Sequence, residues 1–264
     1  MAVARGRTRS VLVRRIGPGQ SGSRRPDELA VEEPMEIRLD GNIVATTMRT
    51  PGHDYELAVG WCHTEGLLAD APVLGVRYCA VGSAVETEFN VVTVDTGGRA
   101  PIPTPRLTTA TSSCGLCGSA SLADLAGRLK PIDDSPEIDD AVLLSMPERV
   151  LAAQTLYGGT GAVHGAAAFT PTGEVLVVRE DIGRHNAVDK VVGRMVLDGR
   201  LPATGLGLYI SGRASFEIVQ KAWAAGFRAV VAVSAPSALA VETAVTAGQQ
   251  LVGFVRHGEG NRYA

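Results

Sequence analysis

The chain has 264 residues, which is enough for one large domain or two modest ones with a buried core. Hydrophobic residues make up 45% and charged residues 20%, and the net charge is −3. This balance lacks the basic field of nucleic-acid-binding proteins, and no apolar run is long enough to span a bilayer. No secretory apolar region follows the first arginines. We therefore expect a cytoplasmic protein that binds neither nucleic acid nor a membrane.

Arginines crowd the first 27 residues, interleaved with glycine, serine and proline. They are Arg5, Arg7, Arg9, Arg14, Arg15, Arg24 and Arg25. This composition predicts a disordered basic tail over residues 1–27. The alternative is an arm that attracts an anionic cofactor or an acidic partner.

Residues 28–100 have the pattern of a small, strand-rich α+β domain. Residues 35–48 alternate apolar and polar side chains around Asp40–Asn42, which predicts a β-hairpin. Asp54 is the expected N-cap of a helix over residues 55–68. Strands are predicted over residues 73–80 and 88–94.

Residues 101–140 carry a Cys-x-x-Cys motif formed by Cys114 and Cys117. A proline-rich stretch at residues 100–106 predicts a domain boundary, and apolar residues at helical spacing follow the second cysteine. We expect a mobile loop and a helix here, because a flexible loop ahead of a helix N-terminus favours a thiolate. An acidic linker at residues 132–140 then leads to a helix over residues 141–157.

The motif suits nucleophilic sulfur chemistry, but two other uses of paired cysteines stay open. With four cysteines and no export signal, the thiols are expected to be reduced, so the pair is reactive or metal-binding. A structural zinc site needs four ligands, and Cys62 and Cys79 are far away in the sequence. Thiol–disulfide exchange is the third use, although the motif does not follow the first strand of a βαβ unit.

Residues 141–264 alternate strands and helices, which predicts an α/β layer with at least partly parallel strands. Strands are expected at residues 174–179, 206–210, 228–233 and 251–255. Helices are expected from residue 186, after Ser215, and over residues 237–247. The pattern at residues 162–169 fits a strand or a helix.

Polar residues gather where these predicted strands end, the place where ligands of open α/β sheets bind. The run from Arg179 to Lys190 lies at one such turn. Ser211, Gly212 and Arg213 lie at another, where helix N-terminal amides and a guanidinium suit a phosphate or pyrophosphate. The glycine-rich stretch around His164 is a weaker signal, because its spacing matches no phosphate-binding motif.

Several of these motifs together resemble the FdhD family of formate dehydrogenase accessory sulfurtransferases. The matching segments are residues 50–60, 64–66, 113–118, 179–190, 211–217 and 251–256, and the resemblance runs from about residue 28 to the end. It implies a cytidine-deaminase-like three-layer domain over residues 141–264, and commonly a homodimer. A deaminase carries a His-x-Glu motif, whereas the segment from His164 to Ala166 has alanine in place of the glutamate. Zinc-dependent deamination is therefore not expected.

The resemblance also implies a reaction and the residues that carry it out. Persulfide sulfur is taken from a cysteine desulfurase and passed to the molybdenum cofactor bis(molybdopterin guanine dinucleotide), which formate dehydrogenase requires. Cys114 corresponds to the persulfide carrier, and Cys117 is a second thiol. The family's cofactor-binding stretch, which would hold the guanine nucleotide, falls on Phe254, Val255, Arg256, His257, Gly258 and Glu259. No metal of the protein's own is implied.

We therefore predict that the chain is a sulfurtransferase with Cys114 as the sulfur carrier. The nucleotide ends of the cofactor are expected to dock at the ends of strands, near Ser211, Gly212 and Arg213. The alternative is a non-enzymatic cofactor-binding chaperone in which Cys114 and Cys117 hold a structural metal.

Overall fold

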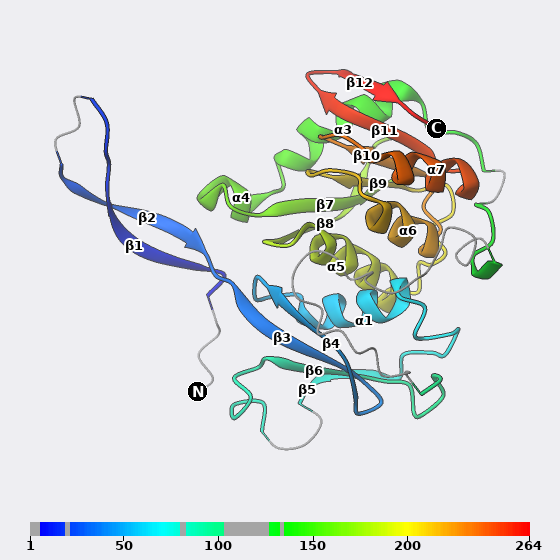
Figure 1. Ribbon diagram of the computed structural model, residues 1–264, viewed down its shortest axis with the longest axis horizontal. Helices are drawn as coiled ribbons and strands as arrows, with labels where there is room; N and C mark the ends of the chain where they lie inside the picture. Colours follow the sequence, from blue (N-terminus) through cyan, green and yellow to red (C-terminus); the bar gives the residue numbers. More distant parts are fainter. Residues whose placement is uncertain (1–5, 19–21, 80–82, 103–126, 133–134) are drawn as a thin grey trace.

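The computed structural model describes residues 6–18, 22–79, 83–102, 127–132 and 135–264. Within these residues the largest sheet has six strands in the order β12-β11-β10-β9-β7-β8 (Figure 1). Their bounds are β7 His164–Phe169, β8 Val175–Asp181, β9 Gly207–Ile210, β10 Ala229–Ala232, β11 Gln250–Arg256 and β12 Glu259–Arg262. Strands β9, β10 and β11 are parallel, and the other pairings are antiparallel. The expected mixed α/β fold is confirmed.

Helices cover both faces of this sheet because successive strand residues point to opposite sides. On one face Leu208 and Ile210 pack against α5 (Arg184–Leu197), α6 (Phe216–Ala224) and α7 (Ala238–Ala247). On the other face Tyr209 and Val231 pack against α3 (Asp140–Leu151). The short helix α4 (Thr155–Thr160) follows α3. The prediction of one helix over residues 141–157 was therefore wrong, because the chain turns between these two helices.

A smaller sheet of four strands packs against helix α1 (Asp54–Thr64). Its order is β4-β3-β6-β5, with β3 Glu33–Leu39, β4 Asn42–Arg49, β5 Gly75–Tyr78 and β6 Val91–Asp95. Asp40 and Gly41 both have positive φ in the turn between β3 and β4, as the hairpin pattern predicted. Helix α1 lies between this sheet and α5 (Figure 1).

Asp54 is the first residue of α1 and not its N-cap. The N-cap is His53, which has a left-handed backbone. The carboxylate of Asp54 instead accepts hydrogen bonds from the buried guanidinium of Arg49 at 3.0 and 3.2 Å. The prediction for this position was wrong because Arg49 competes for the same carboxylate.

The expected disordered tail is wrong at residues 8–14 and 24–27, which form strands. Strands β1 (Thr8–Arg14) and β2 (Arg24–Ala30) pair antiparallel and project from the body (Figure 1). The alternating Val11 and Val13 are only partly exposed in this ribbon, whereas their neighbours are exposed. The prediction rested on the arginine-rich composition and missed this alternation of apolar and polar residues. The domain boundaries at residues 28, 101 and 141 stay predictions, as does the relation to cytidine deaminases.

Candidate functional site

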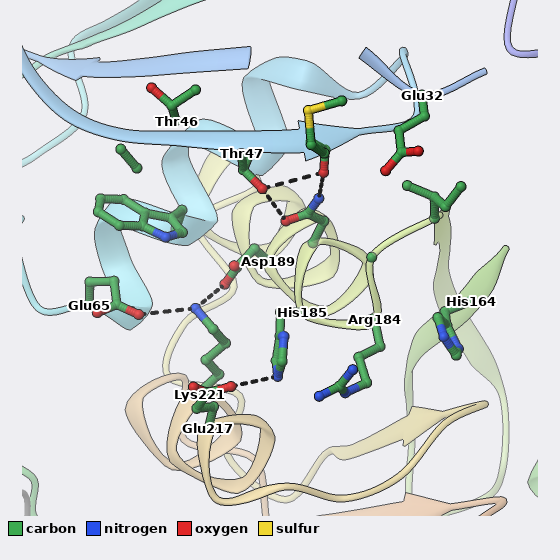
Figure 2. A pocket seen from close by; sticks show the side chains of 16 residues that line it. Glu32, Thr46, Thr47, Glu65, His164, Arg184, His185, Asp189, Glu217 and Lys221 are labelled. Carbon is green, nitrogen blue, oxygen red and sulfur yellow. Dashed lines mark hydrogen bonds and ion pairs between the residues drawn. The ribbon is translucent and has the colours of Figure 1, made fainter. Parts of the chain in front are cut away.

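Two cavities lie near the carboxyl ends of the parallel strands, on either side of His164. Cavity 1, of about 200 Å³, is enclosed by β4, α1 and the N-terminal ends of α5 and α6 (Figure 2). Cavity 2, of about 510 Å³, is enclosed by α3, α4 and the ends of β9, β10 and β11. His164, the first residue of β7, lines both. The predicted docking of the cofactor at strand ends stays a prediction.

Four of the nine residues predicted to bind the cofactor line cavity 2. These are Ser211, Val255, Arg256 and His257. The hydroxyl of Ser211 accepts a hydrogen bond from the amide of Gly165 at 2.9 Å, and Arg256 Nε donates to the carbonyl of Val233 at 3.1 Å. These bonds fix both residues at the mouth of the cavity.

The other five residues lie nearby but line neither cavity. Gly212 packs against the imidazole of His164, where a Cβ would lie 3.3 Å from Nδ1. Arg213 is exposed. Phe254, at the end of β11, is 46% exposed with a positive φ. Gly258 and Glu259 are exposed in the turn that leads into β12 and at its start.

Cavity 2 also contains two tyrosines that the sequence analysis did not single out. Tyr157 comes from α4 and Tyr209 from β9. Burial, reinforced by Tyr157 beside it, raises the pKa of Tyr209 to about 12. Its phenol therefore stays protonated at neutral pH and can donate a hydrogen bond.

The predicted sulfur carrier Cys114 and its neighbour Cys117 lie outside the described residues. The chain's other two cysteines are described, and both are buried. Burial, together with the nearby carboxylates of Asp189 and Glu65, raises the pKa of the Cys62 thiol. Cys79 Sγ lies 2.9 Å from the hydroxyl of Thr87. Neither thiol suits nucleophilic chemistry, because both are buried away from a reaction partner.

The run from Arg179 to Lys190 contributes mainly to structure. Arg179 Nη2 donates to Glu56 of α1 at 2.8 Å. Glu180 accepts from two amides at the N-terminus of α4, at 2.7 and 3.0 Å. Asp181 Oδ2 lies 2.7 Å from Nζ of Lys190, and both side chains are fully buried. Residues between them, at the start of α5, line cavity 1, and the functional role of the run stays a prediction.

A hydrogen-bonded pair, His185 and Glu217, and two ion pairs of Lys221 line cavity 1 (Figure 2). His185 Nε2 lies 2.8 Å from Glu217, and Lys221 Nζ lies 3.0 Å from Asp189 and 3.3 Å from Glu65. Burial alone would raise the pKa of Glu217, but the hydrogen bond and charge of His185, together with the charges of Lys221 and Arg184, lower that pKa overall. Burial likewise opposes the charge of Lys221, but Asp189 and Glu65 outweigh it and raise its pKa.

Arg184 and His164 form the opposite wall and were not among the predicted site residues. Burial, followed by the charges of Arg184, His185 and Arg213, lowers the pKa of His164, so its imidazole is neutral at pH 7. Arg184 Nε is buried with no hydrogen-bond partner in the described part of the chain. Both lie in candidate segments of the sequence, the run from Arg179 to Lys190 and the glycine-rich stretch around His164, but neither of them was assigned a binding role.

A family model described as the FdhD/NarQ family matches residues 30–264, which is most of the chain. The chain belongs to the FdhD/NarQ family. Curated relatives of this FdhD/NarQ chain include proteins of Streptomyces avermitilis and Streptomyces coelicolor, 48% and 49% identical over 251 residues. Each alignment covers 92% of this chain and 89% of the relative. A protein of Mycobacterium tuberculosis is 45% identical and covers 90% of both chains. All three are named sulfur carrier protein FdhD.

The fold of this FdhD/NarQ chain is also found in a solved structure. A crystal structure of a Desulfotalea psychrophila protein, assigned as a formate dehydrogenase accessory protein, superposes with a TM-score of 0.77. The match covers 98% of this chain and 97% of the other at 23% sequence identity, so it shows the shared fold. Among the described residues, no helix is long and apolar enough to cross a membrane, and no cluster of His, Cys, Asp or Glu could hold a metal ion.

Proposed function

We propose that this protein is a sulfur carrier in the maturation of formate dehydrogenase. It would accept persulfide sulfur from a cysteine desulfurase and pass it to bis(molybdopterin guanine dinucleotide), the molybdenum cofactor, which is its bound substrate. The observation that carries the proposal is the set of relatives named sulfur carrier protein FdhD, which match about nine-tenths of this chain at up to 49% identity.

The chemistry of the four cysteines supports Cys114 as the carrier. Sulfur transfer needs an accessible thiolate, and the buried Cys62 and Cys79 do not provide one. In the proposed step the Cys114 thiolate attacks the terminal sulfur of the donor's persulfide. The donor's S–S bond breaks, its cysteine leaves as a thiolate, and Cys114 becomes the persulfide. Cys117 is the second thiol of the pair.

Cavity 2 supports docking of the cofactor's guanine nucleotide. Its volume lies within the usual range of about 300–1,000 Å³ for ligand sites. Tyr157 and Tyr209 offer aromatic surface, and Arg256 and His257 offer donors for phosphate. The nucleotide's pyrophosphate would face Ser211, Gly212 and Arg213. A homodimer would supply a second copy of this site for the cofactor's second guanine nucleotide.

Mass spectrometry after incubation with a cysteine desulfurase and cysteine tests the carrier role. We expect a mass increase of one sulfur atom that disappears in Cys114→Ala and persists in the matched control Cys62→Ala. An adduct that persists in Cys114→Ala would overturn the assignment. Stoichiometric zinc in the purified protein, released together with unfolding by a chelator, would instead favour the cofactor-binding chaperone.

Calorimetric titration with GDP tests cavity 2 independently of sulfur. We expect Arg256→Gln to weaken GDP binding by about tenfold, the loss of one charge-assisted phosphate contact. The matched control is Arg200→Gln, an exposed arginine that follows α5. Equal affinity for GDP in both variants would contradict nucleotide binding in cavity 2.

A further inference from the structure

The two ends of cavity 1 carry side chains of different chemistry (Figure 2). One end, lined by β4 and α1, carries Trp61 and Glu65 and lies beside Asp189. The other end, beside cavity 2, carries Arg184 and His164. A ligand that fits would place hydrogen-bond donors at the first end and an anion at the second.

The first end has an acceptor that nothing in the described part of the chain satisfies. Asp189 is 1% exposed, and Thr64 and Lys221 both donate to its Oδ1, at 2.8 and 3.0 Å. Its Oδ2 has no partner among the described residues. A buried carboxylate oxygen without a donor is costly, and such atoms are normally paired with a ligand or water. Asp189 lines cavity 1, so the missing donor is expected to come from the cavity.

The same end offers an aromatic face. Trp61 lines cavity 1 from α1, one residue after Gly60, where a Cβ would lie 1.8 Å from the carbonyl oxygen of Asp189 in α5. An indole face stacks well on a flat heterocycle. The cavity's volume of about 200 Å³ suits one ring system, with any attached phosphate lying toward cavity 2.

The second end has a donor that lacks an acceptor. Arg184 Nε is buried without a partner in the described ranges, and the neutral His164 lies beside it. A guanidinium in this state suits a phosphate, which accepts several charge-assisted hydrogen bonds. Because His164 lines both cavities, a phosphate here would lie between them.

We propose that cavity 1 binds a fused heterocycle with a 2-amino-4-oxopyrimidine edge, whose phosphate reaches Arg184. The ring N–H and exocyclic amine would donate toward Asp189, and the ring would stack on Trp61. The inference deepens the proposed function and rests on it, because each of the cofactor's two arms contains two rings with this edge, a pterin and a guanine. A pterin in cavity 1 and a guanine in cavity 2 would place the linking phosphates beside His164.

Calorimetric titration with neopterin monophosphate and with GMP tests the proposal on the full chain. We expect Trp61→Leu to weaken binding at cavity 1 by about tenfold or more, from the loss of stacking. We expect Arg184→Gln to weaken the phosphorylated probe but not neopterin itself. The matched controls are Trp223→Phe, on the buried tryptophan of α6, and Arg200→Gln. Thermal unfolding of each variant checks that it is folded.

The two probes identify the source of the ring. Loss of neopterin monophosphate binding in Trp61→Leu, with GMP binding retained, supports a pterin in cavity 1. Loss of GMP binding alone supports a guanine there. Absence of binding by either probe to the wild-type protein, or affinities unchanged by both variants, overturns the proposal. Sulfur loading on Cys114 does not depend on these probes, so a sulfur adduct without ring binding would reject this inference and leave the carrier role intact.

Discussion

Gly60 of α1 and Gly193 of α5 face each other where the two helices cross, with no room for a side chain. A Cβ on Gly60 would lie 1.8 Å from the carbonyl oxygen of Asp189, and one on Gly193 would lie 1.8 Å from that of Glu56. This contact brings Trp61 and Glu65 of α1 to the same cavity as Asp189 of α5. The glycine pair therefore sets the geometry of cavity 1.

Alanine at either glycine should destabilise the protein strongly. The added methyl group would overlap backbone atoms, which cannot move aside as a flexible side chain does. We expect Gly60→Ala and Gly193→Ala each to lower the free energy of unfolding by about 3 kcal/mol or more. Urea denaturation measures this loss. The matched control is Gly75→Ala in β5, where a Cβ meets nothing within 4 Å. An equal, small effect at all three positions would contradict the close contact.

Removal of the buried positive charge of Lys221 should also destabilise the protein strongly. Lys221→Met leaves the carboxylates of Asp189 and Glu65 buried without their cation. Removal of one partner from a buried ion pair costs about 3–5 kcal/mol. The matched control is Arg77→Gln, whose partner Asp95 lies 3.0 Å away at the surface, where both side chains are more than one-third exposed. That control should cost less than about 1 kcal/mol in urea denaturation at pH 7.

The sequence predicted local features well, and the reasons are local. The turn at Asp40 and Gly41 follows from two adjacent residues that tolerate positive φ. The strand ends at Ser211 and Arg256 follow from apolar runs that stop at polar residues. The first hairpin was missed because arginines outnumber the valines that mark its strands.

Cavity 1 could not be predicted in this way. Trp61, Asp189 and Lys221 lie far apart in the sequence, and the cavity exists only because α1 packs against α5 and α6. The run around His185 indicated a site, but it mixes residues that tie the two sheets together with residues that face the cavity. Only the packing separates these roles.

Stability should fall between pH 7.5 and pH 5.5 because of two histidines. Burial lowers the pKa of both His63 and His164 in the folded protein, whereas an unfolded histidine titrates near a pKa of about 6.5. Below that value the unfolded chain binds protons that the folded chain resists, so the unfolded state is favoured as the pH falls. Urea midpoints at the two pH values measure the loss. The urea midpoint of His63→Gln should fall less between the two pH values than that of wild type. An equal fall would show that His63 does not contribute to the pH dependence.

Alkylation should distinguish the buried thiols from a sulfur carrier. Cys62 and Cys79 are buried, and burial raises the pKa of Cys62, so both should resist iodoacetamide at pH 8 in the folded protein. Both should react fully in urea, which serves as the control. Peptide mapping by mass spectrometry measures the modified fraction at each site. Rapid modification of Cys62 in the folded protein would contradict its burial and would restore it as a rival to Cys114 for the sulfur.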